Sequence, residues 1–179
     1  MLARHSLLNF AMKITLIAAI SADGKIAEKA DQSSLDWTSK EDTQFFIETT
    51  KQAGTVVMGR KTFATINKPL KGRRLIILTS NPSQDAPMPG VEFTSEGPAE
   101  LVRRLADEGV AQLALAGGSS VYGQFLKAGL VTDVYLTIEP ILFGAGVPLA
   151  QGFGRIPLKL ISVQQLNEQS ILLHYQIKI

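Results

Sequence analysis

The sequence predicts an α/β fold in which a mostly parallel central sheet carries helices on both faces and ends in an antiparallel C-terminal edge. Short apolar segments alternate with helix-like segments over residues 13–138, which is the pattern of parallel strands joined by crossover helices. Residues 139–179 instead suggest loop and antiparallel strands. At 179 residues the chain suits one domain, assigned to residues 12–179, with residues 1–11 as an N-terminal extension.

The first strand is predicted at residues 13–20. A short apolar run ends at Ile20, and Asp23-Gly24-Lys25 follows it as a turn follows a strand. Basic residues before the run give some likeness to a signal peptide, but its short length and the turn favour a buried strand. A loop rich in Gly, Asp and Ser is expected over residues 22–35.

The first helix is predicted from an N-cap at Ser39 to about residue 52. Asp42 lies in its first turn, and Gly54 ends it. Hydrophobic runs and their glycine or proline boundaries then predict the later elements. These are strands at residues 55–58, 75–78, 91–93, 113–116, 134–138 and 171–177, and helices at residues 61–66, 99–108 and 120–128.

Composition narrows the classes of partner. Hydrophobic residues make up 45% and charged residues 19%, as in an ordinary globular protein. A net charge of +2 without a basic run gives no reason to expect nucleic acid or a membrane as a partner. The chain has no cysteine, and its two histidines, His5 and His174, lie far apart in the sequence. We therefore expect no disulfide and no metal site, and a cytoplasmic location is favoured.

Two glycine turns connect a predicted strand to a predicted helix. One holds Gly59, Arg60 and Lys61, and the other spans residues 116–122 with Gly117 and Gly118. In open α/β sheets ligands bind beyond the carboxyl ends of the strands, and glycine lets a phosphate approach the main chain. Neither turn is a dinucleotide-binding or Walker motif, so structural turns with a solvated helix start remain the alternative.

The order and spacing of five motifs together resemble dihydrofolate reductases. The motifs are residues 14–19 (ITLIAA), 57–63 (VMGRKTF), 69–73 (PLKGR) and 76–80 (IILTS), and Gly117-Gly118 with Val121-Tyr122. The match covers residues 12–138 and continues more loosely afterwards. It implies a dihydrofolate-reductase-like three-layer fold and a reductase that uses NADPH.

The resemblance also assigns cofactor-binding residues. Ala19 would offer its backbone to the nicotinamide carboxamide, and Ser120 stands where many family members have Arg. Arg60 and Lys61 would therefore provide more of the 2′-phosphate recognition. The further residues implied for the phosphates and the adenosine pocket are Gly59, Thr62, Thr79, Ser80, Gly117, Gly118, Ser119, Val121 and Tyr122.

On the substrate side, the resemblance centres on Asp42. Trp37 precedes Asp42 by five residues and Phe46 follows it by four, a spacing that the family shares. Asp42 and Phe46 would face the same side of a helix. The resemblance implies that Thr137 bonds the Asp42 carboxylate, which would bind an aminopyrimidine edge and favour ring protonation. The alternative is a carboxylate that only complements the helix dipole.

Two branches of the family compete. Residues 21–27, 37–42 and 140–149 look like the reductase domain of riboflavin biosynthesis, which reduces the ribosyl group of a phosphoribosylaminopyrimidine. The Asp-Pro-x-Leu segment of that branch is missing after Phe63. Arg73 stands where folate enzymes hold the glutamate α-carboxylate, although an exposed turn cation is the alternative. We favour the riboflavin-like branch, with a pterin such as dihydrofolate as the alternative substrate.

Two further expectations concern function and assembly. A nucleotide-binding module that has lost catalysis is the alternative from a different class, and the cofactor turns together with Asp42 argue against it. Riboflavin-type reductase domains tend to pair, and the apolar segment at residues 138–147 is a candidate two-fold contact. A homodimer is therefore expected.

Overall fold

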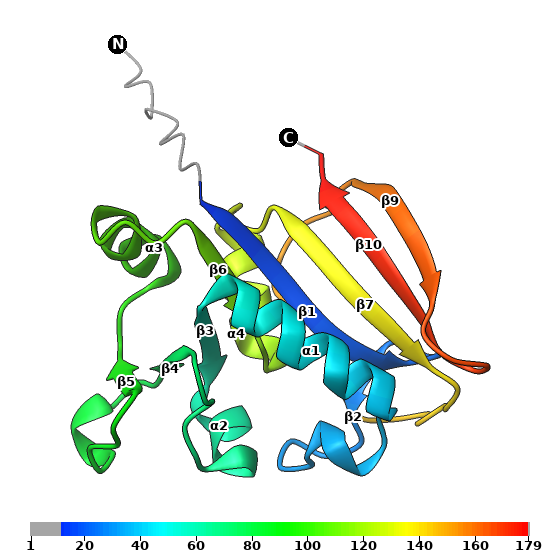
Figure 1. The fold of residues 1–179 in the computed structure, drawn as a ribbon, viewed down its shortest axis with the longest axis horizontal. Helices are drawn as coiled ribbons and strands as arrows, with labels where there is room; N and C mark the ends of the chain where they lie inside the picture. The colour runs from blue at the N-terminus through cyan, green and yellow to red at the C-terminus, as the bar shows by residue number, and fades with distance from the viewer. Residues whose placement is uncertain (1–11, 179) are drawn as a thin grey trace.

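A single mixed sheet organises the protein, whose computed structural model describes residues 12–178 (Figure 1). The extension expected at residues 1–11 lies outside the described residues. In sheet order the strands are β5 (Val91–Thr94), β4 (Arg74–Leu78), β3 (Thr55–Gly59), β6 (Gln112–Leu115), β1 (Lys13–Ser21), β7 (Asp133–Glu139), β10 (Ile171–Ile177) and β9 (Leu158–Gln165). The strands from β5 to β7 run parallel, whereas β10 and β9 are antiparallel to their neighbours. The predicted sheet is confirmed.

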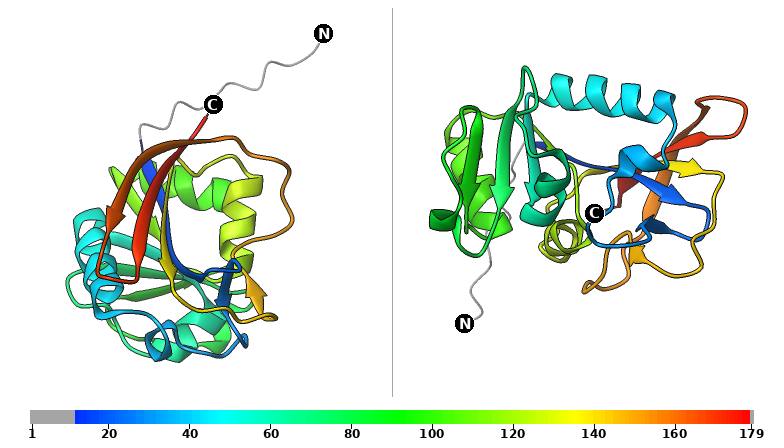
Figure 2. Two further views of the ribbon diagram at one scale, coloured as in Figure 1. Left: turned by 90° about the vertical axis from the view of Figure 1, so that its right-hand side faces the viewer. Right: turned by 90° about the horizontal axis from the view of Figure 1, so that it is seen from below.

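Helices cover both faces of this sheet (Figure 2). They are α1 (Lys40–Ala53), α2 (Arg60–Ile66), α3 (Pro98–Asp107) and α4 (Ser119–Lys127). Phe46 of α1 and Phe63 of α2 belong to one hydrophobic cluster with Met58 of β3. Leu101 of α3 and Phe125 of α4 belong to a second cluster. Because alternate strand residues point to opposite faces, the two clusters form the two apolar layers predicted from the sequence.

The ends of α1 follow the predicted signals. The side chain of Ser39 accepts a hydrogen bond from the backbone N–H of Asp42 at 3.2 Å, which caps the helix. Gly54 has a φ of +74° and ends the helix, a conformation that glycine adopts without a Cβ clash. The cap fixes the backbone of Asp42 at the start of the helix.

The structure adds elements that the sequence did not predict. The expected loop at residues 22–35 contains β2 (Lys25–Ala27) and a short 3-10 helix (Ser34–Asp36). β2 pairs with β8 (Val147–Pro148) in a separate two-stranded sheet. Every residue of β9 is exposed, including its apolar ones, so burial does not mark where this strand begins and ends.

Gly123 of α4 packs directly against the backbone at Gln151. A methyl group on Gly123 would lie 2.2 Å from the Gln151 carbonyl oxygen, which is too close without movement of backbone. We therefore expect Gly123→Ala to lower the free energy of unfolding by about 1–3 kcal/mol. Gly154→Ala is the matched control, because nothing lies within 4 Å of its Cβ position. Urea denaturation checks both variants, and equal stabilities would contradict this packing.

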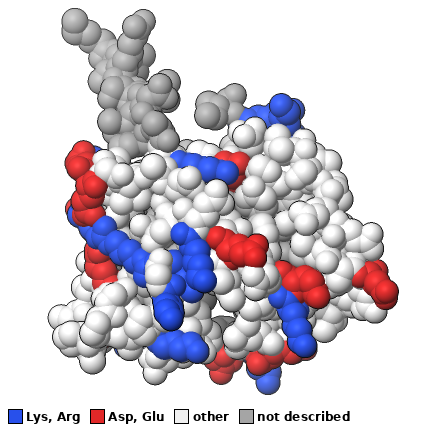
Figure 3. All heavy atoms as spheres, viewed as in Figure 1, with Lys and Arg blue, Asp and Glu red and all other residues white. Residues whose placement is uncertain are grey.

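Figure 3 shows acidic and basic side chains together on one face of the molecule, much of which is uncharged. Within residues 12–178 there is no helix with the length and apolar character needed to span a bilayer.

Candidate active site

A cavity of about 1350 Å³ lies at the carboxyl ends of β1, β3, β4 and β6. Small-molecule pockets usually have about 300–1,000 Å³, so this cavity has room for two ligands side by side. Most of the predicted site residues line it, whereas Trp37 and Thr137 do not. The lining residues among them are Ala19, Asp42, Phe46, Gly59, Arg60, Lys61, Thr62, Arg73, Thr79, Ser80, Gly117, Gly118, Ser119, Ser120, Val121 and Tyr122.

The two glycine turns meet in the middle of this cavity. The backbone N–H of Gly59 donates to the Gly117 carbonyl oxygen at 2.8 Å, which ties the β3–α2 turn to the β6–α4 turn. A Cβ on Gly118 would lie 3.1 Å from Oγ1 of Thr62, and Gly117 has a φ of +103°. Both positions therefore favour glycine, because a side chain on Gly118 would crowd Thr62 and the positive φ of Gly117 is strained for other residues.

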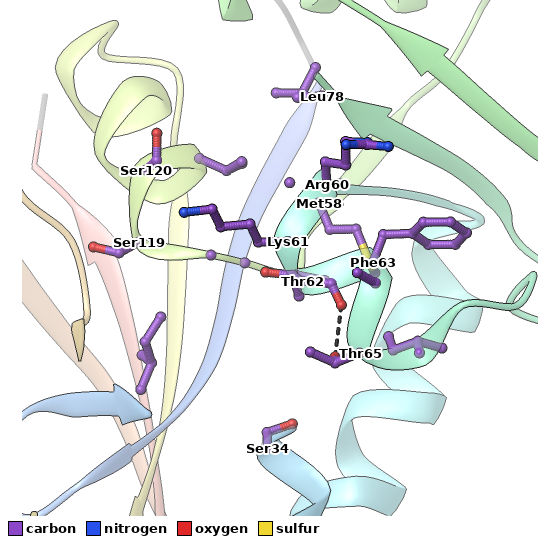
Figure 4. Close-up of a pocket in the computed structure, with 18 of the residues that line it drawn as sticks. Ser34, Met58, Arg60, Lys61, Thr62, Phe63, Thr65, Leu78, Ser119 and Ser120 are labelled. Carbon is purple, nitrogen blue, oxygen red and sulfur yellow. Dashed lines mark hydrogen bonds between the residues drawn. The ribbon is translucent and has the colours of Figure 1, made fainter. Parts of the chain in front are cut away.

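Basic side chains flank the glycine turns. Figure 4 shows Lys61 extending from α2 toward the turn that carries Ser119 and Ser120, while Arg60 points to the side of Leu78 at the end of β4. Lys61 forms no ion pair with any residue from 12 to 178. The cavity thus offers a cation and open backbone together, which suits a phosphate-bearing ligand.

Arg60 has a partner that the sequence did not reveal. Its guanidinium pairs with Asp85 at 2.8 Å, and both residues line the cavity near Thr79 and Ser80. Asp85 lies 25 positions along the chain from Arg60, in the loop between β4 and β5. No local pattern connects the two.

Tyr122 serves the scaffold as well as the cavity wall. Its hydroxyl donates to the Ile17 carbonyl oxygen of β1, and the ring is 3% exposed. Burial raises the pKa of Tyr122 because a phenolate is poorly solvated there. The hydroxyl is therefore a fixed, neutral donor that holds α4 against β1.

Asp42 is a buried acidic residue in the lining of the same cavity. The residue is 9% exposed, and burial raises the pKa of its carboxyl above the ordinary value of 3.8. Hydrogen bonds from Thr137 and Thr38 oppose this rise, whereas the nearby negative charge of Glu139 adds to it. The register of β1 and β7 pairs Ala19 with Thr137, so the predicted nicotinamide contact and the partner of Asp42 lie at the same level of the sheet.

Glu139 is a second buried carboxylate that sequence reasoning missed. It is 2% exposed, and its Oε1 accepts hydrogen bonds from the backbone N–H and the hydroxyl of Ser39, both at 2.8 Å. Its Oε2 accepts from the hydroxyl of Ser170 in the turn between β9 and β10. Glu139 thereby anchors the N-cap of α1, and with it Asp42, to the end of β7.

The remaining predicted substrate residues are placed differently from one another. Phe46 lines the cavity, as does Arg73, which donates from one nitrogen to Oγ1 of Thr50 at 2.8 Å. Partial burial lowers the pKa of the Arg73 guanidinium from its ordinary value, but it stays charged at neutral pH. Trp37 packs edge-on against Phe143 with ring centroids 5.1 Å apart, and its indole nitrogen is buried without a hydrogen-bond partner among residues 12–178. The structure therefore places Trp37 behind the cavity wall instead of on it.

Comparisons with known proteins agree with this architecture. The family model for dihydrofolate reductase matches residues 13–139. An uncharacterized protein of Bacillus subtilis, YwjB, is 27% identical over 174 residues, which cover 91% of this chain and 97% of that protein.

Two solved structures show the same fold. Dihydrofolate reductase from Enterococcus faecalis, in complex with NADP(H) and RAB-propyl, superposes with a TM-score of 0.71 at 24% identity, over 95% of this chain and 98% of that one. A Thermotoga maritima diaminohydroxyphosphoribosylaminopyrimidine deaminase/5-amino-6-(5-phosphoribosylamino)uracil reductase gives a TM-score of 0.76 at 18% identity. The match covers 93% of this chain and 57% of that longer one.

Proposed function

This chain belongs to the dihydrofolate reductase family, and from that premise we propose that it is an NADPH-dependent reductase of an aminopyrimidine-ribosyl or pterin substrate. Within this range we favour the substrate of riboflavin-type reductases. Residues 140–149 support that choice through their likeness to the riboflavin branch. The likeness in fold to the Thermotoga maritima reductase is consistent with it.

The observation that carries the proposal is one cavity that joins the glycine turns to a buried carboxylate. Gly117 and Gly118, with Lys61 beside them (Figure 4), line the same cavity as the buried carboxyl of Asp42. A cofactor bound along the turns would extend toward Ala19, at the level where Thr137 supports Asp42. The residues present therefore fit a dinucleotide beside a small heterocycle.

Each residue then has a defined task. When bound, NADPH supplies the hydride. Lys61, Arg60 and the backbone at Gly117 and Gly118 bind and orient the phosphates. The oxygens of the Asp42 carboxyl can accept hydrogen bonds from the N–H edge of either substrate. The raised pKa of Asp42 lets the carboxyl hold a proton at a higher pH than a solvated aspartate would, which supports ring protonation when the substrate is a pterin.

A hydride-transfer assay tests this function. NADPH is mixed with the protein and with dihydrofolate, dihydropterins or the phosphate of the ribosylaminouracil, and absorbance at 340 nm is followed. We expect consumption of NADPH with the ribosylaminouracil phosphate. No consumption with any of these substrates, despite NADPH binding, would instead identify a nucleotide-binding module without catalysis.

One observation favours dihydrofolate as the second candidate substrate. The guanidinium of Arg73 lines the cavity and is held in place by Thr50. A fixed guanidinium suits a carboxylate, such as the one carried by the glutamate of folates. Faster turnover of dihydrofolate than of the ribosylaminouracil phosphate would establish this alternative.

Cofactor preference gives a direct prediction. Because Arg60 and Lys61 are cations at the proposed adenosine end, NADPH should bind at least about tenfold tighter than NADH, or about 1.4 kcal/mol. Replacing both with Ala should remove most of that preference. Fluorescence titration measures both affinities, and equal affinity of the unmodified protein for the two cofactors would contradict the assignment.

We also propose that the chain forms a homodimer through residues 138–147. In this segment Leu142 is 72% exposed in the single chain, which is unusual for a large apolar side chain. This exposure supports a contact surface that a second copy of the chain would cover. Light scattering at high micromolar concentration should give twice the chain mass, and Leu142→Asp should shift the protein toward the monomer. A monomer mass for the unmodified protein would contradict the proposal.

A further inference from the structure

We propose that Asp85 determines cofactor specificity by occupying the guanidinium of Arg60, so that the protein discriminates less strongly in favour of an adenosine 2′-phosphate than its basic residues alone would allow. The inference rests on the proposed NADPH function and concerns Asp85, to which that function assigns no role. It makes Asp85 a counterweight to Arg60 and Lys61.

The pairing is specific in geometry. Both Nε and one terminal nitrogen of Arg60 lie 2.8 Å from the same oxygen of Asp85, Oδ1. The Arg60 side chain is 54% exposed, whereas that of Asp85 is only 10% exposed. The carboxylate is thus the fixed partner, set into the protein, and the long arginine reaches across to it.

The local fold holds Asp85 in place. A short 3-10 helix (Pro82–Gln84) precedes it, and the backbone N–H of Asp85 donates to the Pro82 carbonyl oxygen at 3.3 Å. The second carboxylate oxygen, Oδ2, is buried and accepts no hydrogen bond from residues 12–178. A buried oxygen without a donor is unfavourable, so the charge of Asp85 depends on Arg60 for compensation.

A phosphate and Asp85 would compete for one cation. Arg60, Asp85, Thr79 and Ser80 line the same end of the cavity. A 2′-phosphate placed there gains from Arg60 but also meets the negative charge of Asp85, and like charges at close range repel. A 2′-hydroxyl carries no charge, so this penalty falls on NADPH and not on NADH.

Binding titrations of the full chain test the inference without relying on catalysis. The probes are NADPH and NADH, together with adenosine 2′,5′-bisphosphate and adenosine 5′-monophosphate, which differ by the 2′-phosphate alone. Asp85→Asn keeps the shape of the side chain and removes its charge. We expect it to tighten NADPH and the bisphosphate about tenfold, while NADH and the monophosphate change less than twofold.

Asp107→Asn is the matched control, because it removes the same charge from an exposed residue at the end of α3 that does not line the cavity. It should leave all four affinities unchanged, and thermal melts of both variants verify that they are folded. Equal tightening of all four ligands by Asp85→Asn, no tightening, or weaker NADPH binding would overturn the role of Asp85. Failure of the unmodified protein to bind either dinucleotide would overturn the proposed function itself.

Discussion

Asp42→Asn is expected to lower turnover by about 10²–10⁴-fold if the Asp42 carboxyl assists ring protonation. Asn keeps the size of the side chain and its position after the Ser39 cap, so the loss reports on the proton and the charge. The affinity for NADPH should barely change, because the cofactor residues lie on other elements. Steady-state kinetics and a cofactor titration measure the two effects separately.

The same variant should be more stable than the unmodified protein at neutral pH. Burial raises the pKa of Asp42 in the folded state above its ordinary value of 3.8, so the folded protein binds this proton more tightly than the unfolded chain. The cost of the buried carboxylate is therefore absent below pH 3.8 and fully present above the raised pKa. A higher melting temperature for Asp42→Asn at pH 7, with no gain at low pH, would confirm this sign.

Kinetics of this variant also separate the two substrate classes. Reduction of a sugar imine needs no protonation of the ring, so a riboflavin-type reaction should lose mainly substrate affinity. Reduction of a pterin ring should lose turnover. If both turnover and substrate affinity stay intact, Asp42 only complements the dipole of α1 and the active site is wrongly placed.

Glu139→Ala should lower the free energy of unfolding by about 2–4 kcal/mol, the second large effect that we expect. The change leaves the backbone N–H and hydroxyl of the partly buried Ser39 and the hydroxyl of the fully buried Ser170 without their acceptor. Urea denaturation gives the difference. A loss below about 0.5 kcal/mol would show that these groups find other partners.

Glu139→Gln separates the charge of this residue from its anchoring. The amide oxygen can still accept from Ser39, but the negative charge that raises the pKa of Asp42 is gone. The pKa of Asp42 should then fall, and activity that needs its proton should decline at a lower pH than in the unmodified protein. Glu48→Gln is the control, because Glu48 is an exposed residue of α1, the helix that carries Asp42. It should leave the pH profile of activity unchanged. An unchanged profile in Glu139→Gln would limit Glu139 to a structural role.

Local sequence signals predicted most of the sheet and all four helices, because strands such as β4 are short buried runs and α1 has a clear cap at each end. They could not predict β2 and β8, which are two or three residues long and exist only through their mutual pairing. Antiparallel strands were expected in residues 139–179, but the bounds of β9 were not predicted, because none of its residues is buried.

In the candidate site, too, residues in local motifs could be predicted from the sequence, whereas contacts between distant segments could not. Arg60, Lys61 and the glycines belong to contiguous motifs, which is why the sequence could propose them as cofactor-binding residues, and the structure places them around one cavity. The residues Ser39 and Glu139 are 100 positions apart in the sequence, so no local motif predicts their contact. Trp37 has the right spacing from Asp42, but spacing does not determine which way a loop side chain faces, and its ring packs on Phe143.

The turn between β9 and β10 contacts the residues around Asp42, although it lies outside the sequence motifs of the site. Ser170 holds Glu139, and Asn167 in the same turn donates to Glu41 in the first turn of α1 at 2.9 Å. Both lie beyond the stretch that the family model matches, which ends at residue 139. After burial, the charge of Glu139 is a further cause of the raised pKa of Asp42, so a substitution at Ser170 that displaces Glu139 should change that pKa and, with it, the pH dependence of activity.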